Sequence, residues 1–224
     1  MPVPGTAHEG WTACGEPART AHVARATGKC EWYSPAAYVD AAREVMGGID
    51  LDPASSATAN EVVGASIYYT AMGNGLMQPW KGRVWMNPPY ANSLITRFAA
   101  RLVCAIDSGD VSEAITLTNN ATETGWFVIL TSRARAICFP RGRVKFWRPG
   151  CESAAPLQGQ ALAYFGPQPG KFMDVFAAFG MVASVHPMCR DDTGQLFTAL
   201  PPGATHPKGD SPCTTQPNPQ SSPA

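Results

Sequence analysis

The residues with the clearest chemical pattern are Asn87-Pro88-Pro89-Tyr90, which directly follow the predicted buried strand at 83–86. Two prolines cannot continue a β-ladder, so the chain leaves its strand at this point. Because proline fixes φ, the Asn87 side-chain oxygen and the Pro88 carbonyl can be held as two acceptors for the hydrogens of a conjugated amino group. Tyr90 offers an aromatic face on which a base flipped out of a duplex can stack. Taken alone, the tetrapeptide is equally compatible with a rigid turn.

A second candidate is Asp50-Leu51-Asp52-Pro53-Ala54, whose acidic-Pro pair closes a short strand at 49–51. It resembles the first cofactor-binding turn of Rossmann-like methyltransferases. In that turn glycines bring the backbone close to the ligand, whereas this chain has Ser55-Ser56-Ala57. The other interpretation is a strand followed by an ordinary helix. In both cases Asp52 is expected to be the N-cap of a helix that runs to about Val63.

Helices and strands alternate around these candidates. Ser34-Pro35 predicts a helix N-terminus with Ser34 as the N-cap, and Gly47-Gly48 predicts the end of that helix. Further strands are expected at 83–86 and 114–117, with a helix at about 93–106 between them. This alternation predicts an α/β fold with a mostly parallel, doubly wound sheet, whose ligands bind at the carboxyl ends of the strands. Asp52 and Asn87 both fall at such ends.

The length of 224 residues and the 45% apolar content favour one domain. We expect a flexible segment at 1–29, the folded domain at 30–185 and a disordered Pro/Ser/Gly-rich tail at 186–224. No signal peptide or membrane-spanning run is visible, which predicts a cytoplasmic protein. The seven cysteines are scattered and contain no C-x-x-C pair, which argues against a zinc site or another structural metal and against a disulfide framework.

Charge is distributed unevenly along a neutral chain. Lys plus Arg and Asp plus Glu both number 17, so no global positive field indicates a nucleic-acid partner. The stretch 124–150, however, contains no acidic residue. It holds six cations, namely Arg133, Arg135, Arg141, Arg143, Lys145 and Arg148. This segment is either a solvated surface or a phosphate-binding surface, for which Arg141 and Arg143 are the candidates.

Several sequence blocks, in this order, resemble the phage-type DNA N-6-adenine methyltransferase (Dam) family. They are Glu31–Pro35, Ile49–Ser55, Ala59-Asn60, Gly75-Leu76, Trp80–Tyr90 and Asn119–Thr124, and the similarity continues through Gly142–Phe146 and Gly159–Ala161. Two features depart from the family pattern. Asn74 precedes Gly75-Leu76 where related enzymes often have an acidic residue, and the stretch 52–87 is too short for two full strand-helix units. The carboxylate that binds the ribose of the cofactor therefore stays unassigned.

The resemblance implies a Rossmann-like fold that uses S-adenosylmethionine to methylate the N6 amino group of adenine in DNA. It also implies a phage or prophage setting, restriction-modification being one such role, inside a bacterial cell. The implied catalytic loop is Asn87, Pro88, Pro89 and Tyr90. The implied cofactor-binding residues are Trp32, Tyr33, Pro35, Asp50, Asp52, Pro53 and Ala54. Asn119, Thr122 and Trp126 would line the far wall of the target pocket.

Three other functions use the same features. An N4-cytosine methyltransferase or a protein-glutamine methyltransferase also acts on a planar conjugated amine and can use an Asn-Pro-Pro-Tyr loop. A DNA-binding relative without catalysis is suggested by the missing glycines after Asp52. Binding of S-adenosylmethionine separates that relative from an enzyme. Neither the target sequence nor the oligomeric state follows from the sequence.

Overall fold

The computed structural model describes residues 32–90, 94–154, 158–186, 188–190 and 196–198, all within one compact unit that begins at Glu31. The predicted flexible segment 1–29 and most of the predicted tail lie outside the described residues. The helices are α1 (Ala36–Met46), α2 (Ala57–Val63), α3 (Leu94–Asp107), α4 (Gly125–Thr131) and α5 (Pro169–Phe176), with a 3-10 turn η1 (Gly75–Met77).

A seven-stranded sheet has the order β2-β1-β3-β4-β8-β5-β9. Its strands are β1 (Leu51–Asp52), β2 (Ile67–Tyr68), β3 (Gly82–Met86), β4 (Val111–Asn119), β5 (Ala136–Pro140), β8 (Gln160–Phe165) and β9 (Gly180–Ser184). The chain passes from β1 to β2 on one side and then returns to β3 on the other side of β1. The strand order therefore reverses between β1 and β3, and ligands of open α/β sheets bind in the crevice at such a point.

The first four strands in chain order are parallel, as the sequence predicted. The rest of the sheet is antiparallel, because β8 runs opposite to both β4 and β5, and β9 runs opposite to β5. The prediction of a mostly parallel sheet thus applies to the half that holds β1 to β4. Since β5 again runs in the direction of β4, the carboxyl ends of β1, β3, β4 and β5 share one edge, which we call the carboxyl edge.

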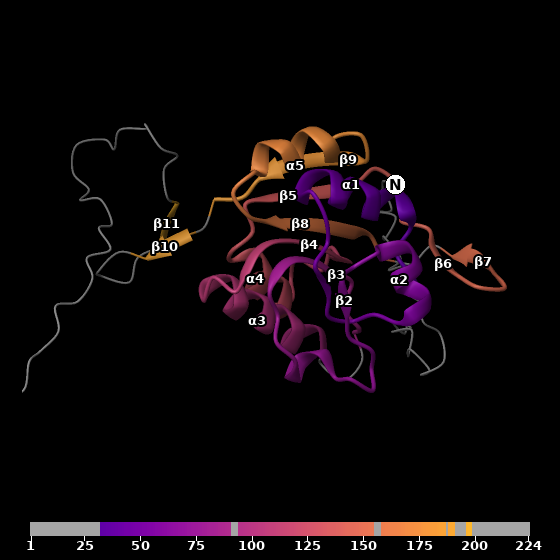
Figure 1. Ribbon diagram of the computed structural model, residues 1–224. Helices are drawn as coiled ribbons and strands as arrows, with labels where there is room; N and C mark the ends of the chain where they lie inside the picture. Colours follow the sequence, from indigo (N-terminus) through magenta and orange to yellow (C-terminus); the bar gives the residue numbers. More distant parts are fainter. Residues whose placement is uncertain (1–31, 91–93, 155–157, 187, 191–195, 199–224) are drawn as a thin grey trace, which may run out of the picture. The chain divides into compact units, whose positions relative to one another are not determined.

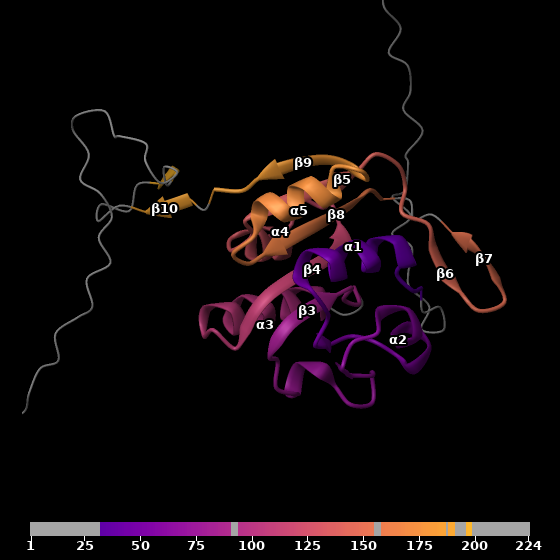
Figure 2. The same cartoon turned by 45° about the horizontal axis from the view of Figure 1, so that its top comes forward.

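Helices cover both faces of the sheet (Figures 1 and 2). One core contains α1 and α5 with Trp85, Ile115 and Leu162, and the other contains α3 and α4 with Val84 and Met86. Neighbouring residues of β3 thus enter different cores. This explains why the last three residues of β3, Val84, Trp85 and Met86, are all apolar and buried rather than alternating with polar residues.

Both predicted N-caps are wrong, and the same two residues have other contacts. Helix α1 begins after Pro35 without a side-chain cap, and the Ser34 hydroxyl instead accepts a hydrogen bond from Asn87. Asp52 accepts a hydrogen bond from the Ala54 N–H (3.2 Å) in a tight turn. Helix α2 therefore starts later, where the Ser56 hydroxyl accepts from the Ala59 N–H (3.2 Å).

Two short antiparallel pairs complete the structure. β6 (Phe146–Arg148) pairs with β7 (Cys151–Ala154), and β10 (Met188–Arg190) pairs with β11 (Leu196–Thr198). Trp147 of β6 also bridges to Tyr33 by two backbone hydrogen bonds (2.8 and 3.1 Å). The second pair falls within the stretch that the sequence predicted to be a flexible tail. The helices that the structure describes include none long and apolar enough to cross a membrane.

Candidate active site

The two predicted turns meet at the carboxyl edge, on either side of the point where the strand order reverses. Leu51 of β1 pairs with Val84 of β3, so Asp52 ends one strand and Asn87 follows a neighbouring strand that runs parallel to it. The turn after β1 also packs tightly against η1. A Cβ atom added to Gly75 would lie 2.0 Å from the Pro53 carbonyl oxygen. Only glycine fits there, which accounts for the Gly75-Leu76 block in structural terms.

Asp52 is a buried carboxylate with 3% of its surface exposed. The Ala54 N–H donates to it at 3.2 Å, and no described Lys or Arg forms an ion pair with it. Burial raises the pKa of Asp52 to about 6, opposed in part by hydrogen bonds from Ser55 and Ala54. A buried carboxylate without a cation, next to a ligand crevice, is the kind of group that binds a positively charged ligand.

Asp50 lies elsewhere, although it is only two residues from Asp52. Its carboxylate forms a two-pronged ion pair with the guanidinium of Arg83 (2.7 and 2.8 Å) and also accepts the Arg83 backbone N–H (2.8 Å). These hydrogen bonds lower the pKa of Asp50. Arg83 lies near the start of β3, at the opposite end of that strand from Asn87. The pair joins β1 to β3, and Asp52 is the carboxylate at the carboxyl edge.

The side chain of Asn87 is oriented by Ser34. The Asn87 Nδ2 donates to the Ser34 hydroxyl at 3.2 Å, and Ser34 is 5% exposed. Since the amide nitrogen is held there, the Asn87 Oδ1 is left as an acceptor. Ser34 is held in turn, because its carbonyl accepts a hydrogen bond from the Trp147 indole N–H (3.0 Å). Pro88 is buried directly after Asn87.

Tyr90 is fixed at both ends of its ring. Its hydroxyl accepts the backbone N–H of Asn119 at 2.5 Å, and its ring meets the Trp126 ring edge-on with centroids 6.0 Å apart. The chain leaves β3 at the two prolines, so the end of β4 has no backbone partner on that side. The Tyr90 hydroxyl oxygen accepts the Asn119 N–H in place of such a partner. Burial raises the pKa of Tyr90 above its ordinary value, so the hydroxyl stays protonated. The residue is still 39% exposed, which leaves ring surface for a ligand.

The predicted far wall is formed by the end of β4 and the start of α4. Asn119 ends β4 and Trp126 lies in the first turn of α4, and both contact Tyr90. Thr122 lies in the turn between them, where its N–H donates to the Asn120 carbonyl (2.9 Å). The structure therefore brings Asn119 and Trp126 to the catalytic loop, whereas Thr122 has no hydrogen bond to the described residues of that loop.

The residues before α1 connect the loop to β6. Tyr33 packs edge-on against Trp147 (ring centroids 5.2 Å apart), and the Arg148 guanidinium lies 5.0 Å from the centre of the Trp32 ring. Through the Ser34 contact with Asn87, this segment lies beside the catalytic loop. Trp32, Tyr33 and Pro35 are all partly buried, so each retains surface at this edge. A role for them in cofactor binding stays a prediction.

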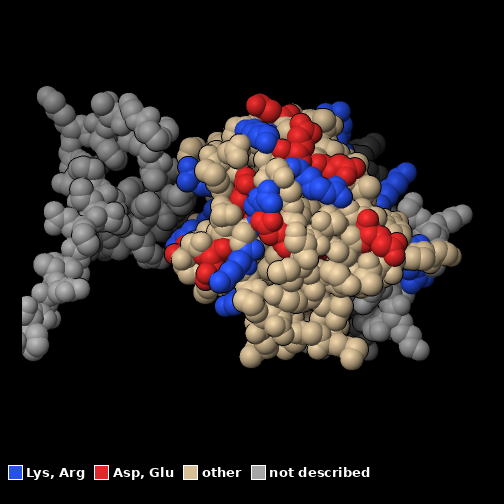
Figure 3. Space-filling view, in the orientation of Figure 1, with Lys and Arg blue, Asp and Glu red and all other residues tan. Residues whose placement is uncertain are grey.

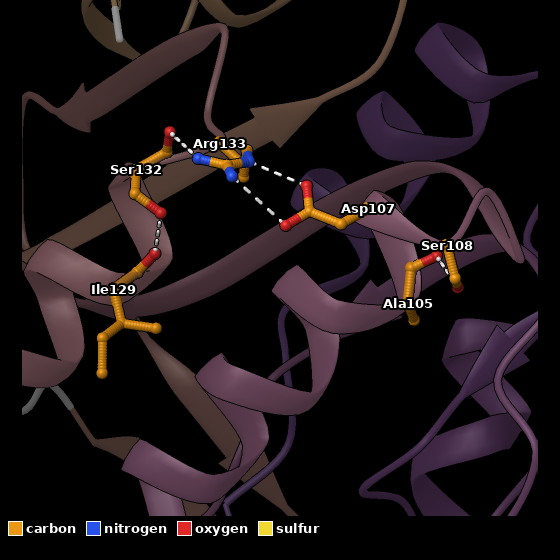
Figure 4. Close-up of polar contacts among 6 residues, drawn as sticks. All are labelled: Ala105, Asp107, Ser108, Ile129, Ser132 and Arg133. Atoms are coloured by element: carbon orange, nitrogen blue, oxygen red, sulfur yellow. Dashed lines mark hydrogen bonds and ion pairs between the residues drawn. The ribbon is translucent and has the colours of Figure 1, made fainter. Parts of the chain in front are cut away.

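The basic stretch is divided between two edges of the sheet. Arg141 and Arg143 are exposed and follow the carboxyl end of β5, on the edge that carries Asn87. Arg133 and Arg135 precede β5 at the opposite edge. Arg133 forms an exposed ion pair with Asp107 (2.8 Å), as Figure 4 shows. Of these four arginines, only Arg141 and Arg143 lie at the carboxyl edge, where they can contact a ligand.

On the face in Figure 3, acidic and basic side chains are intermixed. The lower part of this face, around η1, has no charged side chains, in keeping with the absence of charged residues from Val62 to Trp80. A surface hollow of about 340 Å³ lies where β3 and β4 begin, and Lys81, Arg101 and Asp110 line part of it. It contains none of the predicted site residues. The described residues contain no group of three or more potential metal ligands.

Sequence reasoning missed three residues that contact this site. Ser34 was taken for a helix cap, and Gln158 and Gln160 were given no role. The Gln158 side chain accepts from Asn119 Nδ2 (2.6 Å), and Gln160 Nε2 donates to Asn119 Oδ1 (3.0 Å). The available signal was their position: Ser34 and Gln160 both lie inside blocks that carried the family resemblance.

Comparison with known proteins agrees with this geometry. No curated protein matches the chain. The family model described as DNA N-6-adenine-methyltransferase (Dam) matches residues 22–162, more than half of the chain, and the match includes both turns of the carboxyl edge and the whole of β4. The protein therefore belongs to the DNA N-6-adenine-methyltransferase (Dam) family.

Proposed function

We propose that this protein transfers a methyl group from S-adenosylmethionine to the N6 amino group of adenine in DNA, on a Rossmann-like methyltransferase fold. The observation that carries the proposal is the Asn87 amide. Its nitrogen is bound by Ser34 (3.2 Å), so its oxygen is an oriented acceptor beside a buried carboxylate that has no ion-pair partner among the described residues. Membership of the Dam family favours adenine over cytosine or a protein amide.

The donor molecule fits the residues at the strand reversal. S-adenosylmethionine carries a sulfonium and an ammonium group and supplies an electrophilic methyl group when bound. Asp52 is the buried carboxylate that would interact with its positive charge, and the turn Asp52-Pro53-Ala54 would hold it. Trp32, Tyr33 and Pro35 border the same region through the Ser34 contact. In this proposal Asp50 acts as a structural residue that joins β1 to β3 through Arg83.

The catalytic loop would act on the amino group of the target base. Asn87 Oδ1 and the Pro88 carbonyl accept its two hydrogens, which returns electron density to a nitrogen whose lone pair is delocalised into the ring. Tyr90 and Trp126 hold the flipped base by stacking and edge contacts, at a position fixed by the Asn119 N–H. Arg141 and Arg143 would bind phosphates without reading sequence. This function agrees with a cytoplasmic role in a phage-carrying bacterium.

Two substitutions of Asn87 test this role. Asn87→Asp keeps an acceptor and should retain part of the methyl-transfer rate. Asn87→Leu has a similar volume but no acceptor, and should lose about 3 to 4 kcal/mol of transition-state stabilisation, roughly a hundredfold to a thousandfold in rate. Both variants should bind S-adenosylmethionine as the parent does, measured by calorimetry. Equal rates for Asn87→Leu and the parent would contradict the proposal, as would a parent protein that neither binds the donor nor methylates DNA.

A further inference from the structure

The block Gly159-Gln160-Ala161 has no function in the site described so far. We propose, on the basis of the proposed methyl transfer, that Gln160 is a positioning residue. It holds the end of β4 in place, and through Asn119 it fixes the orientation of the Tyr90 ring. Gln160 is the first residue of β8, lies directly opposite Asn119 in the β4–β8 ladder and is 4% exposed.

Both amide hydrogens of Gln160 are used at this position. Its Nε2 donates to Asn119 Oδ1 at 3.0 Å and to the Gln158 carbonyl at 3.1 Å. Asn119 is held from the other side as well, because its Nδ2 donates to Gln158 Oε1 at 2.6 Å. The three amides form one connected cluster at the carboxyl edge, and its centre is Asn119.

The cluster reaches the catalytic loop through the backbone of Asn119. The N–H of Asn119 points away from β8 and binds the Tyr90 hydroxyl at 2.5 Å, while its side chain is held by Gln160 and Gln158. Strand β3 has already left the sheet here, so β4 has a neighbour on one side only. A residue at such a strand end frays unless its side chain is fixed. Gln160 supplies that restraint from β8.

The backbone next to Gln160 is built for the same contact. The Asn120 N–H donates to the Gly159 carbonyl (3.0 Å), and a Cβ atom at Gly159 would lie 2.7 Å from the Asn120 side chain. Glycine at 159 therefore leaves space for the Asn120 side chain beside Asn119.

The side-chain amide of Gln160 is buried at a position where an apolar side chain would be expected to stabilise the fold better. Its Oε1 is buried and accepts no hydrogen bond from any described residue. Leaving a buried acceptor without a donor is unfavourable, and an apolar side chain of similar volume would avoid that penalty. The position is thus better suited to holding Asn119 than to stabilising the fold, and this difference can be tested.

The test replaces Gln160 by Met, which keeps the length of the side chain and removes its hydrogen bonds. Gln78→Met is the matched control, because Gln78 also donates to a backbone carbonyl (Gly73, 2.8 Å) but has no hydrogen bond to Asn119, Gln158 or Tyr90 among the described residues. Three quantities are measured for both variants: the exchange rate of the Asn119 amide proton by NMR, kcat and KM for methyl transfer, and the melting temperature.

For Gln160→Met we expect Asn119 amide exchange to speed up about fivefold or more, the factor for one typical intramolecular hydrogen bond. We expect kcat to fall by about twofold to tenfold, no more than the loss of the Tyr90 anchor itself, with KM for S-adenosylmethionine unchanged. The melting temperature should stay within about 3 °C of the parent, and Gln78→Met should change neither exchange nor kcat. Combined with Tyr90→Phe, the effects on kcat should be less than additive, because both changes release the same anchor.

Unchanged exchange at Asn119 in Gln160→Met would overturn the inference, whether or not the protein methylates DNA. A fall in kcat that parallels a large loss of melting temperature would assign Gln160 a purely structural role. If exchange speeds up as expected while the parent protein shows no methyl transfer, the positioning of Tyr90 stands and the proposed function fails.

Discussion

Tyr90 has two proposed roles: its hydroxyl holds the catalytic loop against Asn119, and its ring offers a stacking surface for the base. Removal of the hydroxyl tests the first role separately from the second. Tyr90→Phe keeps the ring and its edge contact with Trp126 but leaves the Asn119 N–H without the acceptor that it has at 2.5 Å. This hydrogen bond is solvent-exposed, so water can replace the lost acceptor, and its removal costs about 0.5 to 1.5 kcal/mol. If the whole cost falls on the active position of the loop, methyl transfer slows about twofold to tenfold. Tyr90→Ala should lose a further 1 to 3 kcal/mol, roughly, because the stacking surface is also removed.

The assay is single-turnover transfer of labelled methyl groups to duplex DNA, with donor affinity measured separately by calorimetry. Tyr164→Phe is a matched control. The Tyr164 hydroxyl also accepts a backbone N–H, that of Gln168 (2.9 Å), and it donates to the buried Glu113 (2.5 Å). It pairs with Ile115, towards the opposite edge of the sheet. We expect Tyr164→Phe to lower stability but leave the rate intact below its melting temperature.

Two results would refute this reasoning. If Tyr90→Phe transfers methyl groups at the parental rate, the hydroxyl does not hold the loop in its active position. If Tyr90→Phe is as slow as Tyr90→Ala, the ring face contributes nothing beyond the anchor, and the stacking role is wrong.

Two further predictions concern charge. Replacing Arg141 and Arg143 by Glu should weaken DNA binding for all sequences and reduce the slope of log K against log salt concentration by about 2. The same change at Arg133 and Arg135 should leave this slope unchanged. Equal slopes for both double variants would mean that Arg141 and Arg143 do not bind phosphates. Burial raises the folded-state pKa of Asp52 from the ordinary 3.8 to about 6, so its contribution to stability is largest below pH 3.8, is lost as the pH rises from about 3.8 to 6, and is constant above that. In urea unfolding, the free energy of unfolding of Asp52→Asn should therefore rise by about 2 kcal/mol relative to the parent between pH 4.5 and pH 7.5. The variant should also bind S-adenosylmethionine more weakly at pH 7.5. A difference in unfolding free energy that does not depend on pH would mean that Asp52 is not buried as a carboxylate.

The parts of the fold that local chemistry determines could be predicted from the sequence. The Pro88-Pro89 pair ends β3 where expected, and Gly47 ends α1 in the left-handed conformation that glycine favours. The parallel pairing of β1, β3 and β4 followed from the alternation of helices and strands. The antiparallel half did not, because β8 inserts between β4 and β5 through contacts that no local pattern specifies.

Side-chain partners were harder to predict than elements. A serine before proline is a good helix cap by local rules, yet the Ser34 hydroxyl binds Asn87, 53 residues away in sequence. Asp50 and Asp52 are chemically identical and two residues apart, but Arg83 binds only Asp50. Tyr90 was expected to act through its ring, and the role of its hydroxyl depends on where β4 ends. Each of these outcomes depends on a long-range contact.

Methylation of adenine in DNA at the Asn87 loop is the proposed activity of this protein and can be tested in cells. The most direct test expresses the protein in a bacterium without DNA methylation and measures modified nucleosides in the hydrolysed genomic DNA by mass spectrometry. We predict N6-methyladenine with the parent protein and its loss with Asn87→Leu, while both proteins accumulate to the same level. N4-methylcytosine instead of N6-methyladenine, no modified nucleoside from the parent, or equal N6-methyladenine from Asn87→Leu would contradict the account.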